Sequence, residues 1–99
     1  MLKFAHEFEE VPQYGDLSDD LYEAPLGAKI EFSNADNGIW LSANSEGFLY
    51  LARMFAELGS RDLKEGYHFH RPEWLRPAAA GQEVSVEVLN GNRSADAQP

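Results

Sequence analysis

The chain of 99 residues is predicted to adopt an α+β fold, a small antiparallel or mixed sheet of about four strands with one helix packed on one face. Two observations predict this class. Apolar residues recur at helical spacing between residues 45 and 58, and they alternate with polar residues in shorter stretches on either side. Strands that are half polar and half apolar are typical of sheets that bury one face only. The expected order of elements is therefore β-β-α-β-β.

The first two strands are expected to form a hairpin over residues 28–42. In the first of them Ala28, Ile30 and Phe32 share one face, and the residues between them are polar or charged. Asn37 and Gly38 suit the positive φ of a tight turn. Residues 39–42 would then form the returning strand.

The helix is expected over residues 45–58. Asn44 precedes it and is a suitable N-cap, because its side-chain oxygen can accept a hydrogen bond from an amide of the first turn. Gly59 is expected to end the helix in a left-handed conformation. The apolar stripe is expected to be Phe48, Leu51, Ala52, Phe55 and Leu58, packed on Ile30, Phe32, Tyr67, Phe69, Val84 and Val86.

The last two strands are expected at residues 67–70 and 83–89. Pro72 would end the first, because proline cannot donate a hydrogen bond to a sheet. In the second, Val84, Val86 and Val88 alternate with polar residues and share one face. Trp74 lies in the loop between the strands, where it could close on the core.

Charge divides the chain into three parts. The net charge is −9, and residues 1–25 hold seven acidic residues and a single lysine. We therefore expect an acidic N-terminal segment at residues 1–27, with a short strand at residues 2–8 as one option. Residues 28–90 would form the α+β domain, and the polar residues 91–99 a disordered tail. Such an acidic chain would repel nucleic acid and attract a basic protein, although acidity also serves solubility alone.

The sequence argues against several classes of function. Without cysteine the chain has neither a thiolate nucleophile nor a thiolate metal site. It contains no glycine-rich phosphate loop and no nucleophile elbow, so we expect no enzymatic activity and no cofactor. No apolar run approaches the roughly 20 residues of a membrane span, and we expect a cytoplasmic protein without membrane or nucleic-acid partners.

His68 and His70 are the residues best suited to bind a metal ion. Two residues apart on a strand, they share one face, and two imidazoles can bind the same ion if further ligands are available. A carboxylate of Glu31, Glu83 or Glu87 could contribute. Because no third ligand is defined, we expect two ordinary polar histidines and no specific metal.

Residues 44–89 contain three motifs: the helix opening N-S-E-G-F-L-Y-L-A, the strand Y-H-F-H, and a proline-glycine loop that leads to E-V-S-V-E-V. Through these motifs, this part of the chain resembles the immunity protein 32 family of bacterial polymorphic toxin systems. The resemblance implies a non-enzymatic inhibitor that binds a toxin domain and protects the cell that makes it. The first 25 residues lie outside the resemblance.

A basic toxin domain, such as a nuclease, is the partner that this reading implies. The acidic segment would steer its approach, and aromatic residues would be buried on binding. Two alternatives are a metal-binding module or metal-dependent enzyme that uses His68 and His70, and a regulatory interaction domain. The oligomeric state is left open. The predicted partner-binding residues are Glu7, Glu9, Tyr14, Asp16, Asp19, Asp20, Tyr22, Glu23 and Trp40, although Trp40 suits a core position equally well.

Overall fold

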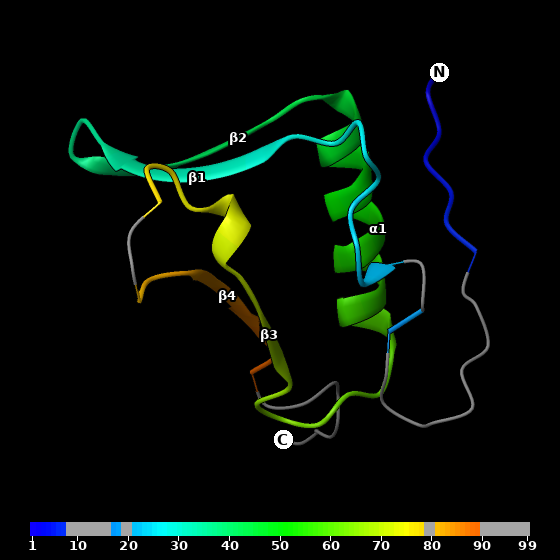
Figure 1. The fold of residues 1–99 in the computed structure, drawn as a ribbon. Helices are drawn as coiled ribbons and strands as arrows, with labels where there is room; N and C mark the ends of the chain where they lie inside the picture. The colour runs from blue at the N-terminus through cyan, green and yellow to red at the C-terminus, as the bar shows by residue number, and fades with distance from the viewer. Residues whose placement is uncertain (8–16, 19–20, 79–80, 90–99) are drawn as a thin grey trace.

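A computed structural model describes residues 1–7, 17–18, 21–78 and 81–89 (Figure 1). The order β-β-α-β-β is confirmed for these residues. The elements are β1 (Ile30–Ala35), β2 (Gly38–Ala43), α1 (Ser45–Ser60), β3 (His68–Arg71), the short 3-10 helix η2 (Pro72–Trp74) and β4 (Val84–Glu87). No helix in this part of the chain combines the length and apolar character that crossing a membrane requires.

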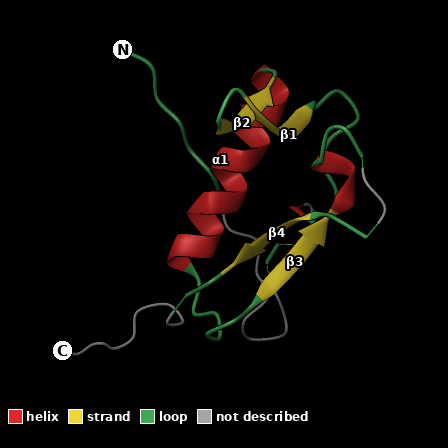
Figure 2. Cartoon of the chain, turned by 90° about the vertical axis from the view of Figure 1, so that its left-hand side faces the viewer, coloured by secondary structure: helices red, strands yellow, loops and turns green. Residues whose placement is uncertain are grey.

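The four strands form two antiparallel hairpins, so the expectation of one four-stranded sheet is wrong. One sheet pairs β1 with β2 and the other pairs β3 with β4 (Figure 2). They are linked where Phe32 bridges Leu75 in parallel and the Arg76 amide donates to the Phe32 carbonyl at 2.9 Å. Pro72 has already ended β3 by this point. On the edge of β1 that is not paired with β2, only a short piece of chain around Leu75 therefore pairs with it.

The hairpin turn lies one residue earlier than expected. Asp36 and Asn37 have φ of 53° and 63°, whereas Gly38 already belongs to β2. Positive φ at both central residues is the geometry of a two-residue hairpin turn, and Asp and Asn tolerate it better than most residues.

The start of α1 is as predicted, but its end is not. The Asn44 side chain accepts a hydrogen bond from the Gly47 amide at 2.8 Å and another from the Lys29 amide at 2.9 Å. The cap thus also ties the hairpin to the helix. At the other end the helix continues through Gly59 to Ser60, and Arg61 follows in an extended conformation. A left-handed glycine cap is therefore not used.

The face of α1 that meets the core differs from the predicted stripe. Tyr50, Leu51 and Met54 are buried, while Phe48 and Phe55 are 49% and 50% exposed. Gly47 explains the difference, because a Cβ at this position would lie 2.3 Å from the Lys29 carbonyl oxygen. The backbone of the hairpin therefore approaches the helix at Gly47, and this contact turns the face of Gly47 and Tyr50 inward.

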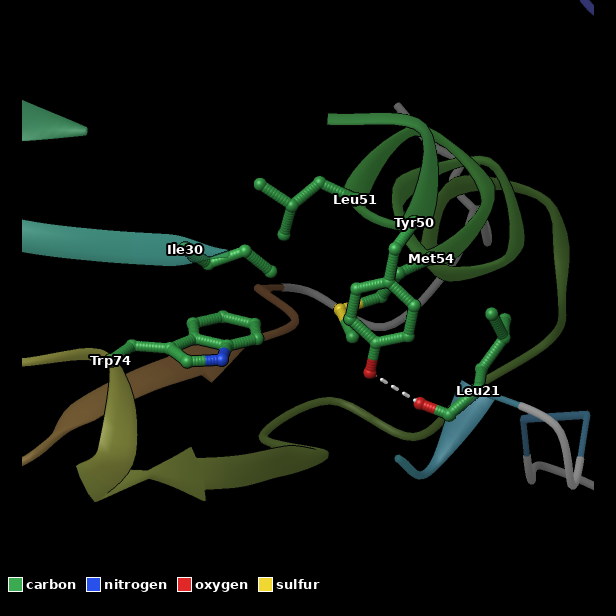
Figure 3. Close-up of a cluster of buried hydrophobic side chains, with 6 residues drawn as sticks. All are labelled: Leu21, Ile30, Tyr50, Leu51, Met54 and Trp74. Carbon is green, nitrogen blue, oxygen red and sulfur yellow. Dashed lines mark hydrogen bonds between the residues drawn. The ribbon is translucent and has the colours of Figure 1, made fainter. Parts of the chain in front are cut away.

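The hydrophobic core lies between α1, the start of β1 and η2 (Figure 3). Trp74 is buried and stacks with Phe32, with 6.0 Å between ring centres, so its alternative role as a lid on the core is confirmed. Burial raises the pKa of the Tyr50 phenol, and its hydroxyl donates to the Leu21 carbonyl at 2.6 Å. The buried cluster comprises Leu21, Ile30, Tyr50, Leu51, Met54 and Trp74.

Candidate protein-binding surface

The β1–β2 hairpin carries three consecutive exposed apolar side chains. Ile39, Trp40 and Leu41 are 72%, 52% and 39% exposed. The hairpin register places Trp40 opposite Ser33, on the face away from Ile39 and Leu41. The Trp40 indole N–H donates to the Ala35 carbonyl at 2.9 Å, which fixes the ring at the surface. Figure 1 shows that the turn of this hairpin projects away from α1.

The outer face of α1 is a second apolar surface. Phe48, Leu49 and Phe55 are each about half exposed, and Ala52 and Ala56 lie between them on the same side of the helix. Soluble domains rarely expose apolar residues in groups, and such groups mark interaction sites. The chain therefore exposes aromatic and aliphatic side chains on two elements that meet at Asn44.

A cleft of about 700 Å³ opens between residues 22–31 and residues 70–76. Tyr22 and Glu23 line one side, and Arg71 and Trp74 line the other. Arg71 holds the two sides together, since its guanidinium donates to the Tyr22 carbonyl at 3.1 Å and lies over the Phe69 and Trp74 rings. The charged residues that line the cleft are Glu23, Lys29, Glu31, Arg71, Glu73 and Arg76, so neither sign of charge prevails.

The structure does not gather the predicted partner-binding residues into one patch. Tyr22 and Glu23 line the cleft, Trp40 lies on the hairpin, and Glu7 is exposed near the N-terminus. The exposed position of Trp40 removes the alternative that it belongs to the core. The remaining predicted residues lie outside the described part of the chain; they are Glu9, Tyr14, Asp16, Asp19 and Asp20.

A buried carboxylate ties the N-terminal segment to α1, and sequence reasoning missed it. Glu57 is fully buried. Its oxygens accept hydrogen bonds from the Ser18 amide at 2.9 Å, the Ser18 hydroxyl at 2.6 Å, and Arg61 Nε at 2.8 Å. His6 Nε2 donates to the same carboxylate at 2.5 Å. The only local signal was the spacing of Glu57 and Arg61, which suits an i,i+4 ion pair.

The charge of Glu57 is stabilised despite its burial. Burial by itself would raise the pKa of the carboxyl, but hydrogen bonds from Arg61, Ser18 and His6 outweigh this effect and lower the pKa to about 2. Serine, histidine and a carboxylate also occur in hydrolases, but there histidine stands between the other two. Here the carboxylate stands between Ser18 and His6, and Ser18 is buried. The order of the three groups therefore differs from that of a hydrolase triad, and their described contacts tie the N-terminal segment to α1.

The two histidines of β3 are exposed on the open face of the second hairpin. His68 Nδ1 lies 2.7 Å from the Gly66 carbonyl oxygen, and His70 Nδ1 lies 3.0 Å from a Glu83 carboxylate oxygen and 2.7 Å from the Ser85 hydroxyl. Within the described ranges, no group of three or more histidine and acidic side chains is placed so that it could hold a metal ion.

Comparisons of the chain with family models, with curated proteins and with solved structures find no match of any of the three kinds. The arguments that follow accordingly rest on the sequence and on the geometry given above.

Proposed function

We propose that this chain is a non-enzymatic immunity protein of the cytoplasm that binds and neutralises a basic toxin domain. The observation that carries the proposal is the exposed trio Ile39, Trp40 and Leu41 on a projecting hairpin, in a chain with a net charge of −9. The resemblance of residues 44–89 to the immunity protein 32 family supports the same assignment.

The hairpin has the chemistry of an interface anchor. Tryptophan dominates the binding energy of many interfaces, because it buries a large apolar area and loses little conformational freedom. The hydrogen bond from Trp40 to Ala35 holds the indole in place before binding. An ordered side chain loses less entropy when a partner covers it. We therefore assign Trp40 as the central contact.

The negative charge of the chain is the second argument, and it supports the basic character of the proposed partner. The excess of carboxylates would steer a basic domain toward this chain and speed association, especially at low salt. Ser18 is fixed to Glu57 and Leu21 lies in the core, so both residues of the acidic segment are held against α1. The exposed Tyr22 and Glu23 follow directly on Leu21 and line the cleft. This anchoring would present them to the partner in a defined position.

Co-expression with a candidate toxin encoded beside this chain tests the proposal. We expect the wild-type chain to restore growth and to co-purify with the toxin. Trp40→Ala should weaken binding about 30-fold, the effect of a hot-spot residue worth about 2 kcal/mol. Leu89→Ala is the matched control, because Leu89 is 74% exposed but lies outside the first hairpin.

Two results would contradict the proposal. One is a folded chain that neither binds nor protects against any toxin encoded beside it. The other is full binding and protection by Trp40→Ala, which would remove the hairpin from the interface. A regulatory interaction domain would differ from both, because it would bind a partner without restoring growth.

A further inference from the structure

The rings of His68 and His70 lie in an arrangement that suits a shared ion. Their centres are 5.0 Å apart, and their planes are inclined by 67°. Two imidazoles that bind one tetrahedral ion through bonds of about 2.1 Å hold their ring centres about 5 Å apart. The spacing that the strand gives these residues is therefore the spacing that a common ligand requires.

The hydrogen bonds of the two rings leave the same atom of each available. A carbonyl oxygen can only accept, so Nδ1 of His68 donates to Gly66. Nδ1 of His70 is hydrogen-bonded to the Ser85 hydroxyl, and the Glu83 carboxylate oxygen 3.0 Å from the same atom favours a proton there, which Nδ1 donates to that hydroxyl. In the neutral rings Nε2 then carries the lone pair. Among the described residues, neither Nε2 atom is engaged in a hydrogen bond. Both rings are thus ready to bind through Nε2.

The groups that hold Nδ1 are the kind that support metal-binding histidines. Such histidines commonly donate their other N–H to a carboxylate or a backbone carbonyl, which fixes the tautomer and the ring orientation. The Gly66 carbonyl accepts from His68, and the Glu83 carboxylate lies 3.0 Å from Nδ1 of His70, beside the Ser85 hydroxyl. Glu87 pairs with His68 across the hairpin and shares its face, which adds negative charge beside the pair.

We propose that His68 and His70 form an exposed site for a divalent transition-metal ion that favours imidazole ligands, such as Zn²⁺. Nitrogen ligands select this class over Mg²⁺ and Ca²⁺, which prefer oxygen. The chain supplies two ligands from β3, and water completes the coordination shell. The sequence alone argued against a metal because no third ligand was defined. The 5.0 Å separation of the rings and the partners of their Nδ1 atoms are what now favour a solvent-completed site.

Titration of the purified full chain with Zn²⁺ alone tests the proposal, with binding followed by calorimetry and by the NMR signals of the histidine rings. We expect one saturable site per chain and selective shifts of the His68 and His70 rings. His68→Ala and His70→Ala should each weaken binding by more than about tenfold. Glu83→Gln should weaken it less, because only the ring support is changed.

Two controls separate this site from general attraction of cations to an acidic chain. Glu73→Gln removes an exposed carboxylate on another element and should leave the Zn²⁺ affinity unchanged. Ca²⁺ should not compete, because it has little affinity for imidazole. The proposal is overturned if Zn²⁺ does not saturate a single site, if binding survives in His68→Ala/His70→Ala, or if Ca²⁺ binds equally well. Circular dichroism should show that these surface variants remain folded.

Discussion

One face of α1 packs Tyr50, Leu51 and Met54 into the core, whereas the other leaves Phe48 and Phe55 half exposed. The two faces have similar apolar character, yet they differ in what lies against them. The inner face includes Gly47, where the missing Cβ admits the Lys29 carbonyl, and it ends at Glu57, where Ser18 and His6 meet the helix. Long-range contacts of the backbone and of one carboxylate therefore decide which apolar face is buried.

The two faces of α1 therefore have different roles, one in folding and the other in the proposed binding. Residues of the inner face stabilise the fold, because their removal would leave a cavity or an unpaired charge. Residues of the outer face contribute less to folding and remain available for a partner, as does Trp40 on the hairpin. Three perturbations of α1 can break or sharpen this comparison.

A large effect is expected from the titration of Glu57. Its pKa is about 2 in the folded chain against an ordinary value of 4.5. A lowered folded-state pKa means stability that is complete above pH 4.5 and is lost as the pH falls from there toward 2. The expected loss in the free energy of unfolding is about 3 kcal/mol. Chemical denaturation at a series of pH values measures it.

Glu57→Gln is the control for this titration, since other carboxylates also titrate in the same range. The variant should be less stable at neutral pH, and its stability should fall by less between pH 4.5 and 2. Equal falls in both proteins would show that Glu57 is not held as an ion by Ser18, Arg61 and His6.

A smaller effect is expected at the glycines of α1. Gly47→Ala should destabilise the fold by about 1–3 kcal/mol, because the new Cβ would overlap the backbone oxygen of Lys29. Gly59→Ala meets nothing within 4 Å and should stabilise the helix, by up to about 1 kcal/mol. Thermal or chemical unfolding of both variants measures the contrast. Similar effects of the two substitutions would refute close docking of the hairpin at Gly47.

Local patterns predicted much of the fold. Alternation located the hairpins, and Asn44 marked the start of α1, because each signal lies within a few residues of the element it specifies. The inner face was not predictable in this way, since the stripe through Phe48 and Phe55 fits helical spacing as well as the stripe through Gly47 and Met54. The choice depends on Lys29, which is 18 positions away from Gly47 in the sequence.

The same distinction applies to the candidate surfaces. Trp40 could be singled out from the sequence, but its exposure could not be predicted, because the same strand pattern suits a core position. The contact of Glu57 with Ser18 and His6 spans 39 and 51 residues, and neither partner carries a signal of its own. A histidine pair is visible in the sequence, but the hydrogen bonds of its rings to Gly66 and Ser85 are not.

The most direct test of the account compares Phe55→Ala with Met54→Ala in chemical denaturation. Met54 is buried and its neighbour Phe55 is half exposed, and each substitution removes a large apolar side chain. We expect Met54→Ala to lower the free energy of unfolding by about 2–5 kcal/mol, and Phe55→Ala to lower it by less than about 1 kcal/mol. Equal losses, or a larger loss for Phe55→Ala, would contradict the assignment of the buried face and of the exposed one.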